Sequence, residues 1–232
     1  MIRCLLICEG SCDQLIFSLL KNLFDENILE IKPFNRCCAD RKNLFKLTNE
    51  IVEEILAREH GYTLKDFQEI CYLIDSDGMF TSDDKIFSIS DLNSIEYTEK
   101  TIRCKEKRSI ITRNNIRVKN VAELLQTRKY WIFYNSRNLE HAFDEAKSFE
   151  LTNNAKKRFA LDIRTKYLNN EEDFIIKLFD MNKSKTTNLF KSWEYLKEGS
   201  NSLSSCSNII IFIIMHFNAL KKEYKDLILK LI

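Results

Sequence analysis

Two short apolar segments, each followed at once by acidic residues and a glycine, constrain the fold of this 232-residue chain most strongly. The first is Ile2–Cys8, which is followed by Glu9-Gly10, and the second is residues 70–74, followed by Asp75-Ser76-Asp77-Gly78. A short apolar run without polar alternation is typical of a strand that is buried on both faces. The two segments therefore predict central strands of a parallel sheet.

The segments around these runs have the patterns of further strands and helices. Apolar residues recur at helical intervals in residues 13–24 and 44–57, and another helix is expected at 118–126. Residues 28–34 and 130–134 are the remaining strand candidates. Strands that alternate with helices predict an α/β fold, with a mainly parallel four-stranded sheet and helices on both faces.

The pattern changes after Asn138, where only helical spacing is found. The segments are residues 138–147, 151–168, 171–180, 186–197 and 203–231. We therefore expect an all-helical C-terminal extension. The predicted domains are residues 1–145, with a basic insertion at about 79–117, and a helical region at 146–232 that packs on the first domain.

No segment has the pattern of a membrane anchor. The longest apolar stretch, residues 209–215, is far shorter than the roughly 20 apolar residues that a membrane-spanning helix needs. The first residues also lack the cleavage pattern of a secretory signal. We expect a cytoplasmic, soluble protein without a membrane partner.

The eight cysteines do not have the spacing of a zinc site. No two of them form a C-x-x-C pair, and no histidine lies at zinc-finger spacing. We expect them to be buried free thiols in a reducing compartment.

Charge is segregated along the chain, although the net charge is only +2. Residues 1–100 carry 11 basic and 19 acidic side chains, whereas residues 101–135 carry 9 basic and 2 acidic ones. The alternation in residues 101–118 favours an extended β ribbon with a basic edge that contacts nucleic-acid phosphates, and a surface hairpin with solvated charges is the alternative. The candidate nucleic-acid-binding residues are Arg103, Lys105, Lys107, Arg108, Arg113 and Arg117.

The acidic residues that end the two apolar strands are candidate metal ligands. Ligands of open parallel sheets bind beyond the carboxyl ends of the strands, so Glu9, Asp75 and Asp77 meet if their strands are neighbours. Carboxylates held close together repel one another, and a divalent cation such as Mg²⁺ relieves that repulsion. The alternative is that Asp-Ser-Asp-Gly is only a tight turn.

The joint pattern resembles the motifs of Toprim domains, which have a Rossmann-like fold. LLICEGSCDQLIF resembles the first motif, a strand that runs into Glu-Gly, and YLIDSDG resembles the Asp-x-Asp motif. The resemblance implies that Glu9 is a general acid or base and that Asp75 and Asp77 bind Mg²⁺ or Mn²⁺. Asp13 matches the acidic position after Glu-Gly, whereas Cys12 departs from the usual threonine.

A third segment is similar to small RloB-like and OLD-type nucleases of phage defence. FYNSRNLEHAF, residues 133–143, resembles their Ser-Asn-Pro-x-Phe-Glu segment, with Glu140 as the matching acid and Asn135 or Asn138 near it. The proline and phenylalanine of that segment are missing. The resemblance covers roughly residues 1–145 and adds Glu140 to the candidate catalytic residues Glu9, Asp75 and Asp77.

These observations favour a Mg²⁺-dependent nuclease that hydrolyses RNA, with tRNA as one candidate, or DNA. The resemblance implies a toxic effector in anti-phage defence, with a partner ATPase or a homo-oligomer. Any ATP dependence would come from a partner, because the chain has no G-x-x-x-x-G-K loop. Two alternatives stay open: a non-catalytic module that binds nucleic acid or protein, and a receiver-like α/β domain, which Glu9-Gly10 fits poorly.

Overall fold

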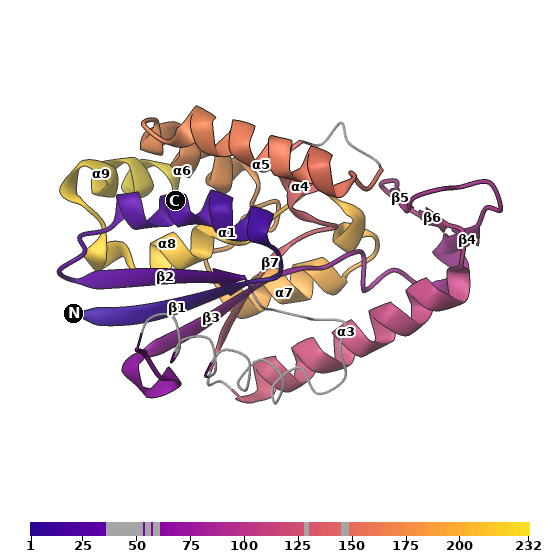
Figure 1. Cartoon of the computed structure of the whole chain (residues 1–232), viewed down its shortest axis with the longest axis horizontal. Coiled ribbons are helices and arrows are strands. Elements are labelled where there is room, and N and C mark those ends of the chain that lie inside the picture. The colour runs from indigo at the N-terminus through magenta and orange to yellow at the C-terminus, as the bar shows by residue number, and fades with distance from the viewer. Residues whose placement is uncertain (36–52, 54–56, 58–60, 128–129, 145–148) are drawn as a thin grey trace.

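A four-stranded parallel sheet forms the centre of the computed structural model, which describes residues 1–35, 53, 57, 61–127, 130–144 and 149–232. The strand order is β2-β1-β3-β7 (Figure 1). The strands are β1 Ile2–Cys8, β2 Leu29–Asn35, β3 Glu69–Asp75 and β7 Trp131–Asn135. The predicted α/β class and all four predicted strands are confirmed. The helix predicted at 44–57 falls almost entirely outside the described residues.

The position of each strand follows from its sequence. β1 and β3 are adjacent in the middle of the sheet, and their continuous apolar runs are buried on both faces. β2 lies at one edge, where Pro33 is tolerated because the outer side of the strand needs no ladder hydrogen bond. β7 lies at the other edge, which side chains of the C-terminal region cover: Trp193 donates to the Ile132 carbonyl, and Asn208 accepts from the Tyr134 N–H.

Helices cover both faces of the sheet (Figure 1). One face carries α1 Ser11–Phe17, which packs against the long helix α5 Asn153–Tyr167. The opposite face carries α3 Lys107–Thr127. The remaining helices are α4 Leu139–Phe143, α6 Glu171–Asp180, α7 Leu189–Lys197, α8 Ile210–Met215 and α9 Lys222–Leu231. Short 3₁₀ segments are Ser18–Leu23, Leu64–Asp66, Asp83–Lys85, Asn201–Leu203 and Phe217–Ala219.

The helices after residue 138 share the core of the sheet. A single hydrophobic cluster includes Leu5 and Leu73 from the central strands together with Trp193 and Phe212 from α7 and α8. The predicted helices at 151–168, 171–180 and 186–197 are found, whereas the segment predicted at 203–231 is divided into shorter helices. The domain boundary at residue 145 stays a prediction.

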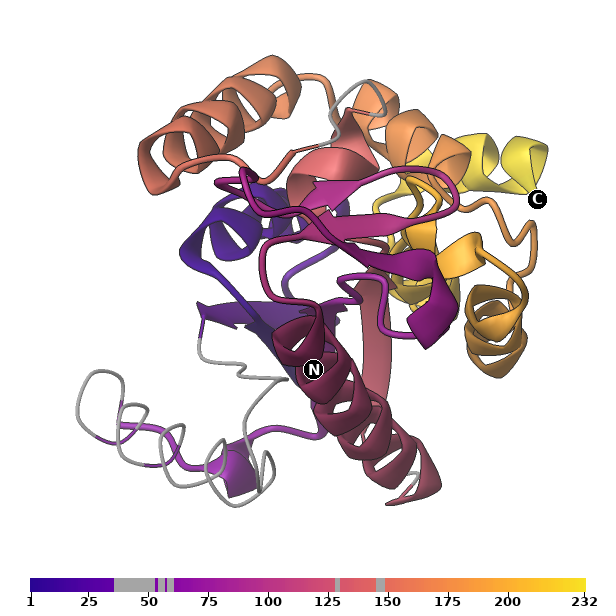
Figure 2. The same cartoon turned by 90° about the vertical axis from the view of Figure 1, so that its right-hand side faces the viewer.

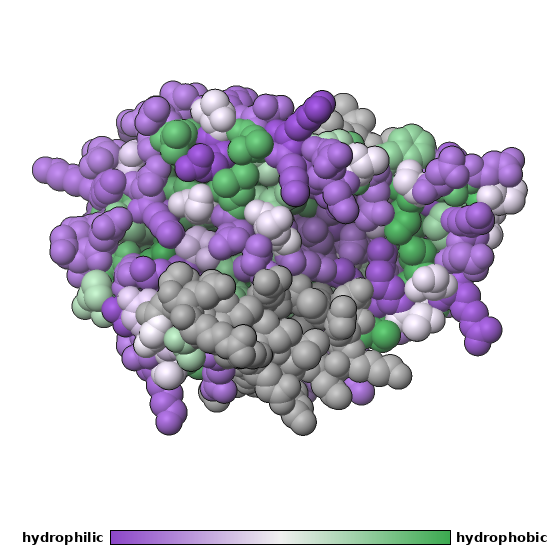
Figure 3. Space-filling model, viewed as in Figure 1, coloured by the Kyte–Doolittle hydropathy of each residue, from purple (hydrophilic) through white to green (hydrophobic). Residues whose placement is uncertain are grey.

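The surface seen in Figure 3 is mainly hydrophilic, and its hydrophobic areas are small and separate. Among the described residues, no helix has both the length and the apolar character that crossing a membrane requires.

A second, three-stranded sheet lies in front of the carboxyl ends of the main strands (Figure 2). It has the order β4-β6-β5, with β4 Ile86–Ser88, β5 Glu96–Tyr97 and β6 Ile102–Cys104. These strands have a small hydrophobic cluster of their own, which includes Tyr97, Ile102 and Leu203.

The β ribbon predicted for residues 101–118 is wrong. Only β6 is extended there, and the basic residues from Lys107 onward belong to the helix α3. The buried face of α3 follows helical spacing through Ile110, Asn114, Arg117, Val121 and Leu124. Two of these buried residues are polar, so the apolar pattern that indicates a helix was interrupted in the sequence.

Candidate active site

The carboxyl ends of β1, β3 and β7 meet at a cleft of about 600 Å³. The four residues predicted to be catalytic, Glu9, Asp75, Asp77 and Glu140, all line this cleft. Glu9 and the Asp pair lie in direct contact range, because Oε2 of Glu9 accepts a hydrogen bond of 2.9 Å from the backbone N–H of Asp75. The predicted convergence of acids at neighbouring strand ends is therefore what the structure has.

An unusual backbone turn presents the Asp pair. Asp77 has φ 47° and Gly78 has φ 66°, both in the left-handed region. A non-glycine residue rarely adopts that conformation unless its surroundings enforce it. Here the Asp77 N–H donates to the carbonyl of Arg137 at 2.7 Å, and Arg137 itself has φ 57°. The turn after β3 and the turn after β7 thus hold each other in place.

Helix α3 holds the same turn from the other side. Arg117 donates to the Asp75 carbonyl at 2.6 Å, Arg113 to the Asp77 carbonyl at 3.0 Å, and Asn114 to the Gly78 carbonyl at 3.3 Å. All three donate to backbone carbonyls at the end of β3 or in the turn that follows it. The polar residues on the buried face of α3 therefore position the acidic turn.

Arg117 also neutralises two of the predicted metal ligands. Its side chain is 4% exposed, and its guanidinium contacts both carboxylate oxygens of Glu9, at 3.1 and 2.5 Å. It lies 2.9 Å from Oδ2 of Asp77 as well. Burial alone would raise the pKa of Asp77, but Arg117 and Arg113 outweigh burial and lower it. Glu9 and Asp77 are therefore charge-compensated by the chain itself.

Asp13 and Asp75 have no such ion pair among the described residues. Burial, Glu9 and Glu140 raise the pKa of Asp13 to about 7. Burial and the carboxylates of Asp13 and Glu9 raise the pKa of Asp75 well above its usual range. Nδ2 of Asn135 lies between them, 3.3 Å from an oxygen of each. Without a further cation, Asp13 and Asp75 are therefore driven toward their neutral forms.

Local capping explains why Asp13 and Glu140 point into this space. Asp13 is the third residue of α1, and its Oδ2 accepts a 3.0 Å hydrogen bond from the N–H of Gly10. Asn138 caps α4 by accepting from the N–H of His141, which places Glu140 in the first turn of that helix. A Cβ at Gly10 would lie 2.9 Å from Oδ2 of Asp13, so a larger residue there would displace the Asp13 carboxylate.

Two lysine side chains also line the cleft. Lys156 and Lys157 both come from α5. Burial favours the neutral form of Lys156, but Glu140 and Glu150 outweigh burial and raise its pKa, so its ammonium group stays charged. A fixed positive charge beside a cluster of acids is suited to binding a phosphate group.

The free ligand groups of the cleft fit Mg²⁺ or Mn²⁺. Asp13, Asp75 and Glu140 offer carboxylate oxygens, and Oδ1 of Asn135 is buried without a hydrogen-bond partner among the described residues. Hard divalent cations prefer such oxygen ligands. No three described acids of the cleft bring ligand atoms within 4.8 Å of one another. A cation there would keep several waters, which is usual for Mg²⁺.

The six candidate nucleic-acid-binding residues fall into two groups. Arg113 and Arg117 line the acidic cleft, where both contact the Asp pair rather than solvent. The other four lie around β6 and the start of α3, outside the cleft lining. Of these, Arg103 pairs with Glu96, and Lys105 and Arg108 are exposed. A continuous basic edge is therefore not formed by these six residues.

Sequence reasoning missed Glu150, Lys156 and Lys157, which line the cleft, and Tyr97 beside it. Both lysines lie in a helix with no motif around them, and Tyr97, whose hydroxyl donates to Asp77 at 3.3 Å, comes from the small sheet. No local pattern marks any of them. In the comparisons with known proteins, no family model, curated protein or solved structure matches this chain.

Proposed function

We propose that this protein is a Mg²⁺- or Mn²⁺-dependent nuclease of the Toprim kind that hydrolyses phosphodiester bonds. The observation that carries the proposal is the charge balance of the cleft. Its lining has six acidic side chains and four basic ones, so two negative charges are uncompensated when all are ionised. One divalent cation supplies the missing charge at the place where oxygen ligands converge.

The side chains divide between two tasks. Asp13 and Asp75 would hold the cation directly and Glu140 through a bound water, while Arg117 fixes the positions of Glu9 and Asp77. A bound divalent cation polarises a phosphodiester and stabilises the oxygens that attack and leave. This assignment keeps Asp75 as a metal ligand and adds Asp13 to the residues proposed from the sequence.

The chain's own groups would supply orientation and proton transfer. Lys156 is placed to bind a phosphate oxygen. Hydrolysis forms a bond between a water oxygen and phosphorus and breaks the bond to the leaving oxygen, which takes up a proton. Glu9 is the proposed acid or base, and Arg117 keeps its carboxylate directed at the cleft. A role in defence and a partner ATPase or homo-oligomer remain proposals from the resemblance alone.

A non-catalytic binding module is the second candidate, and one observation favours it. Arg117 satisfies Glu9 and Asp77 without any cation, as a structural ion-pair network would. In that case the cleft would bind nucleic acid or protein without cutting it.

The deciding experiment compares cleavage of labelled RNA and DNA with Mg²⁺, Mn²⁺ or chelator. The variants are Asp75→Asn and Glu9→Gln, with Asp84→Asn as the matched control, because Asp84 is an exposed acid outside the cleft lining. We expect the native chain and Asp84→Asn to cleave one of the substrates in a cation-dependent way. Asp75→Asn and Glu9→Gln should be slower by at least about a hundredfold.

Two outcomes count against the nuclease. Equal cleavage by all four proteins would show that a contaminating enzyme cuts the substrate. Binding of RNA or DNA without cleavage under any cation would favour the binding module.

A further inference from the structure

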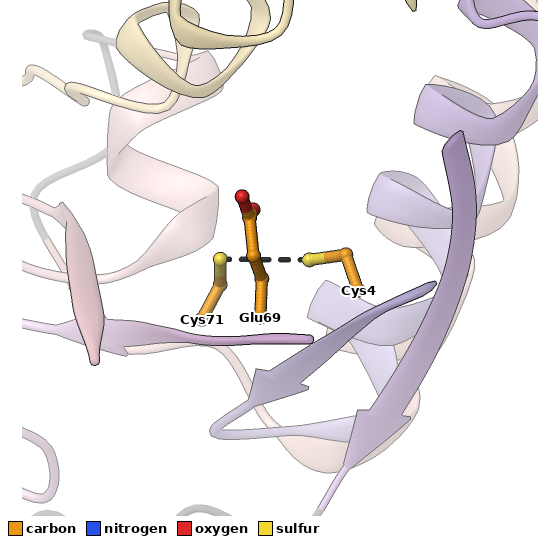
Figure 4. A group of neighbouring side chains, drawn as sticks. All are labelled: Cys4, Glu69 and Cys71. Carbon is orange, nitrogen blue, oxygen red and sulfur yellow. Dashed lines mark hydrogen bonds between the residues drawn. The ribbon is translucent and has the colours of Figure 1, made fainter. Parts of the chain in front are cut away.

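A second cluster of ligand-type side chains lies on one face of the sheet, away from the acidic cleft. It consists of Cys4 on β1 and of Glu69 and Cys71 on β3 (Figure 4). Cys4 is the register partner of Glu69, and Glu69 and Cys71 are two residues apart, so all three project from one face. Among the described residues this is the one group of three such side chains whose ligand atoms all lie within 4.8 Å of one another.

The spacing of the two sulfurs suits a shared metal ion. Sγ of Cys4 and Sγ of Cys71 are 3.5 Å apart. A disulfide would need about 2.05 Å. Two thiolates on one tetrahedral zinc, with bonds of about 2.3 Å, are separated by roughly 3.8 Å. The sulfurs are therefore already near the separation that zinc requires, and they belong to the two central strands.

Glu69 is held in position from outside the cluster. Nε2 of His216 lies 2.7 Å from Oε2 of Glu69, and Nδ1 of His216 lies 2.9 Å from the carbonyl of Phe212. The imidazole therefore bridges Glu69 on β3 and Phe212 in α8. Metal-binding carboxylates are commonly oriented by such a second hydrogen bond.

Zinc binding adds no net charge to this group. A divalent cation that replaces the two thiol protons of Cys4 and Cys71 leaves the net charge of the group unchanged. This matters because both sulfurs belong to fully buried residues, where an uncompensated charge is costly.

We propose that Cys4, Cys71 and Glu69 form a zinc site with a structural role. Thiolate ligands select Zn²⁺ over Mg²⁺. The Glu69 side chain is 26% exposed, so solvent has access for a fourth ligand. Cys4 precedes Glu9 by five residues of β1, which separates this site from the acidic cleft by roughly 16 Å. A zinc ion there ties β1 to β3 and, through His216, to the end of α8.

The test is metal binding by the full chain, reduced and freed of metal, in the absence of Mg²⁺. We expect about one zinc per chain, with release of thiol protons, and a thiolate-to-cobalt charge-transfer band when Co²⁺ is used. The paired change Cys4→Ala/Cys71→Ala should abolish both signals. Cys104→Ala, a buried thiol of the small sheet, should leave them unchanged.

Further variants separate this site from other thiols. His216→Ala should weaken zinc binding about 10- to 100-fold, because Glu69 loses its orienting partner. A charge-transfer band that survives Cys4→Ala/Cys71→Ala but disappears in Cys37→Ala/Cys38→Ala would overturn the proposal. The absence of any thiolate band in the unchanged protein would overturn it as well. That outcome does not depend on whether a variant folds. Neither readout depends on nuclease activity.

Discussion

Asp13 is the residue whose environment has the clearest thermodynamic consequence. It is buried beside Glu9 and Glu140, and its pKa in the folded protein is raised from 3.8 to about 7. Between these values the folded chain keeps a proton that the unfolded chain releases. The free energy of unfolding of the metal-free protein therefore falls as pH rises through this range. Asp75, whose pKa is raised by the same surroundings, contributes with the same sign.

We accordingly expect the metal-free native chain to be more resistant to urea at pH 5 than at pH 8. Asp13→Asn should flatten this dependence and stabilise the protein at pH 8, because it removes the buried carboxylate. The measurement is the urea midpoint across this pH range in the presence of chelator. A native midpoint that rises with pH, unchanged by Asp13→Asn, would contradict the assignment.

Arg117 both neutralises carboxylates and holds the backbone at the end of β3. Its guanidinium binds Glu9 and Asp77 and also the carbonyl of Asp75. A planar group with several fixed donors can serve these partners together, whereas a lysine ammonium cannot reach them in one geometry. Its role could not be read from the sequence, because an arginine in a basic stretch is usually solvent-exposed.

At the scale of elements, the turn after β3 depends on glycine at position 78. Gly78 has φ 66°, and a Cβ there would lie 2.8 Å from Leu203 and 3.0 Å from Ile102. Gly199 has a similar φ of 57°, but nothing lies within 4 Å of the position its Cβ would take. Substituting each glycine therefore distinguishes the cost of backbone strain from the cost of steric crowding.

Gly199→Ala should lower the free energy of unfolding by about 1 kcal/mol, from the left-handed backbone alone. Gly78→Ala should cost about 1 to 3 kcal/mol more, because the added methyl group meets packed side chains. Denaturant unfolding of both variants measures the difference. An equal loss of unfolding free energy in the two variants would show that side chains packed with the small sheet do not crowd the turn.

The elements differ in how far the sequence could predict them. The strands were predictable because β1 and β3 are continuous apolar runs that end abruptly at acids. Helix α3 was predicted only in its second half, at 118–126, because Asn114 and Arg117 occupy the buried face of the first half and contact the turn instead of the core. Glu9, Asp75 and Asp77 were predictable from strand ends. The cysteine pair was not, since its members are 67 residues apart in the chain.

At the scale of the molecule, the C-terminal helices complete the same core as the sheet. Trp193 is fully buried, and its ring nitrogen donates to the carbonyl of Ile132 on β7. Phe212 packs edge to face on Phe133 of the same strand, at 5.8 Å between ring centroids. Because these contacts join the two predicted regions into one core, we expect neither region to be stable without the other.

A fragment of residues 1–145 is therefore expected not to unfold cooperatively. The measurement is circular dichroism during urea titration, which compares the unfolding of the fragment with that of the whole chain. A sharp transition of the fragment near the midpoint of the whole chain would instead support an independent domain that ends at residue 145.

Residues that come much later in the chain cover the edge strand β7, and this has a consequence during synthesis. Trp193, Ser207 and Asn208 supply the partners of the outer edge of this strand. A ribosome that has added residue 145 has 63 more residues to add before it has made Asn208, which takes about 3 to 13 s at ordinary elongation rates. During that interval the nascent sheet has an open edge that other chains can pair with.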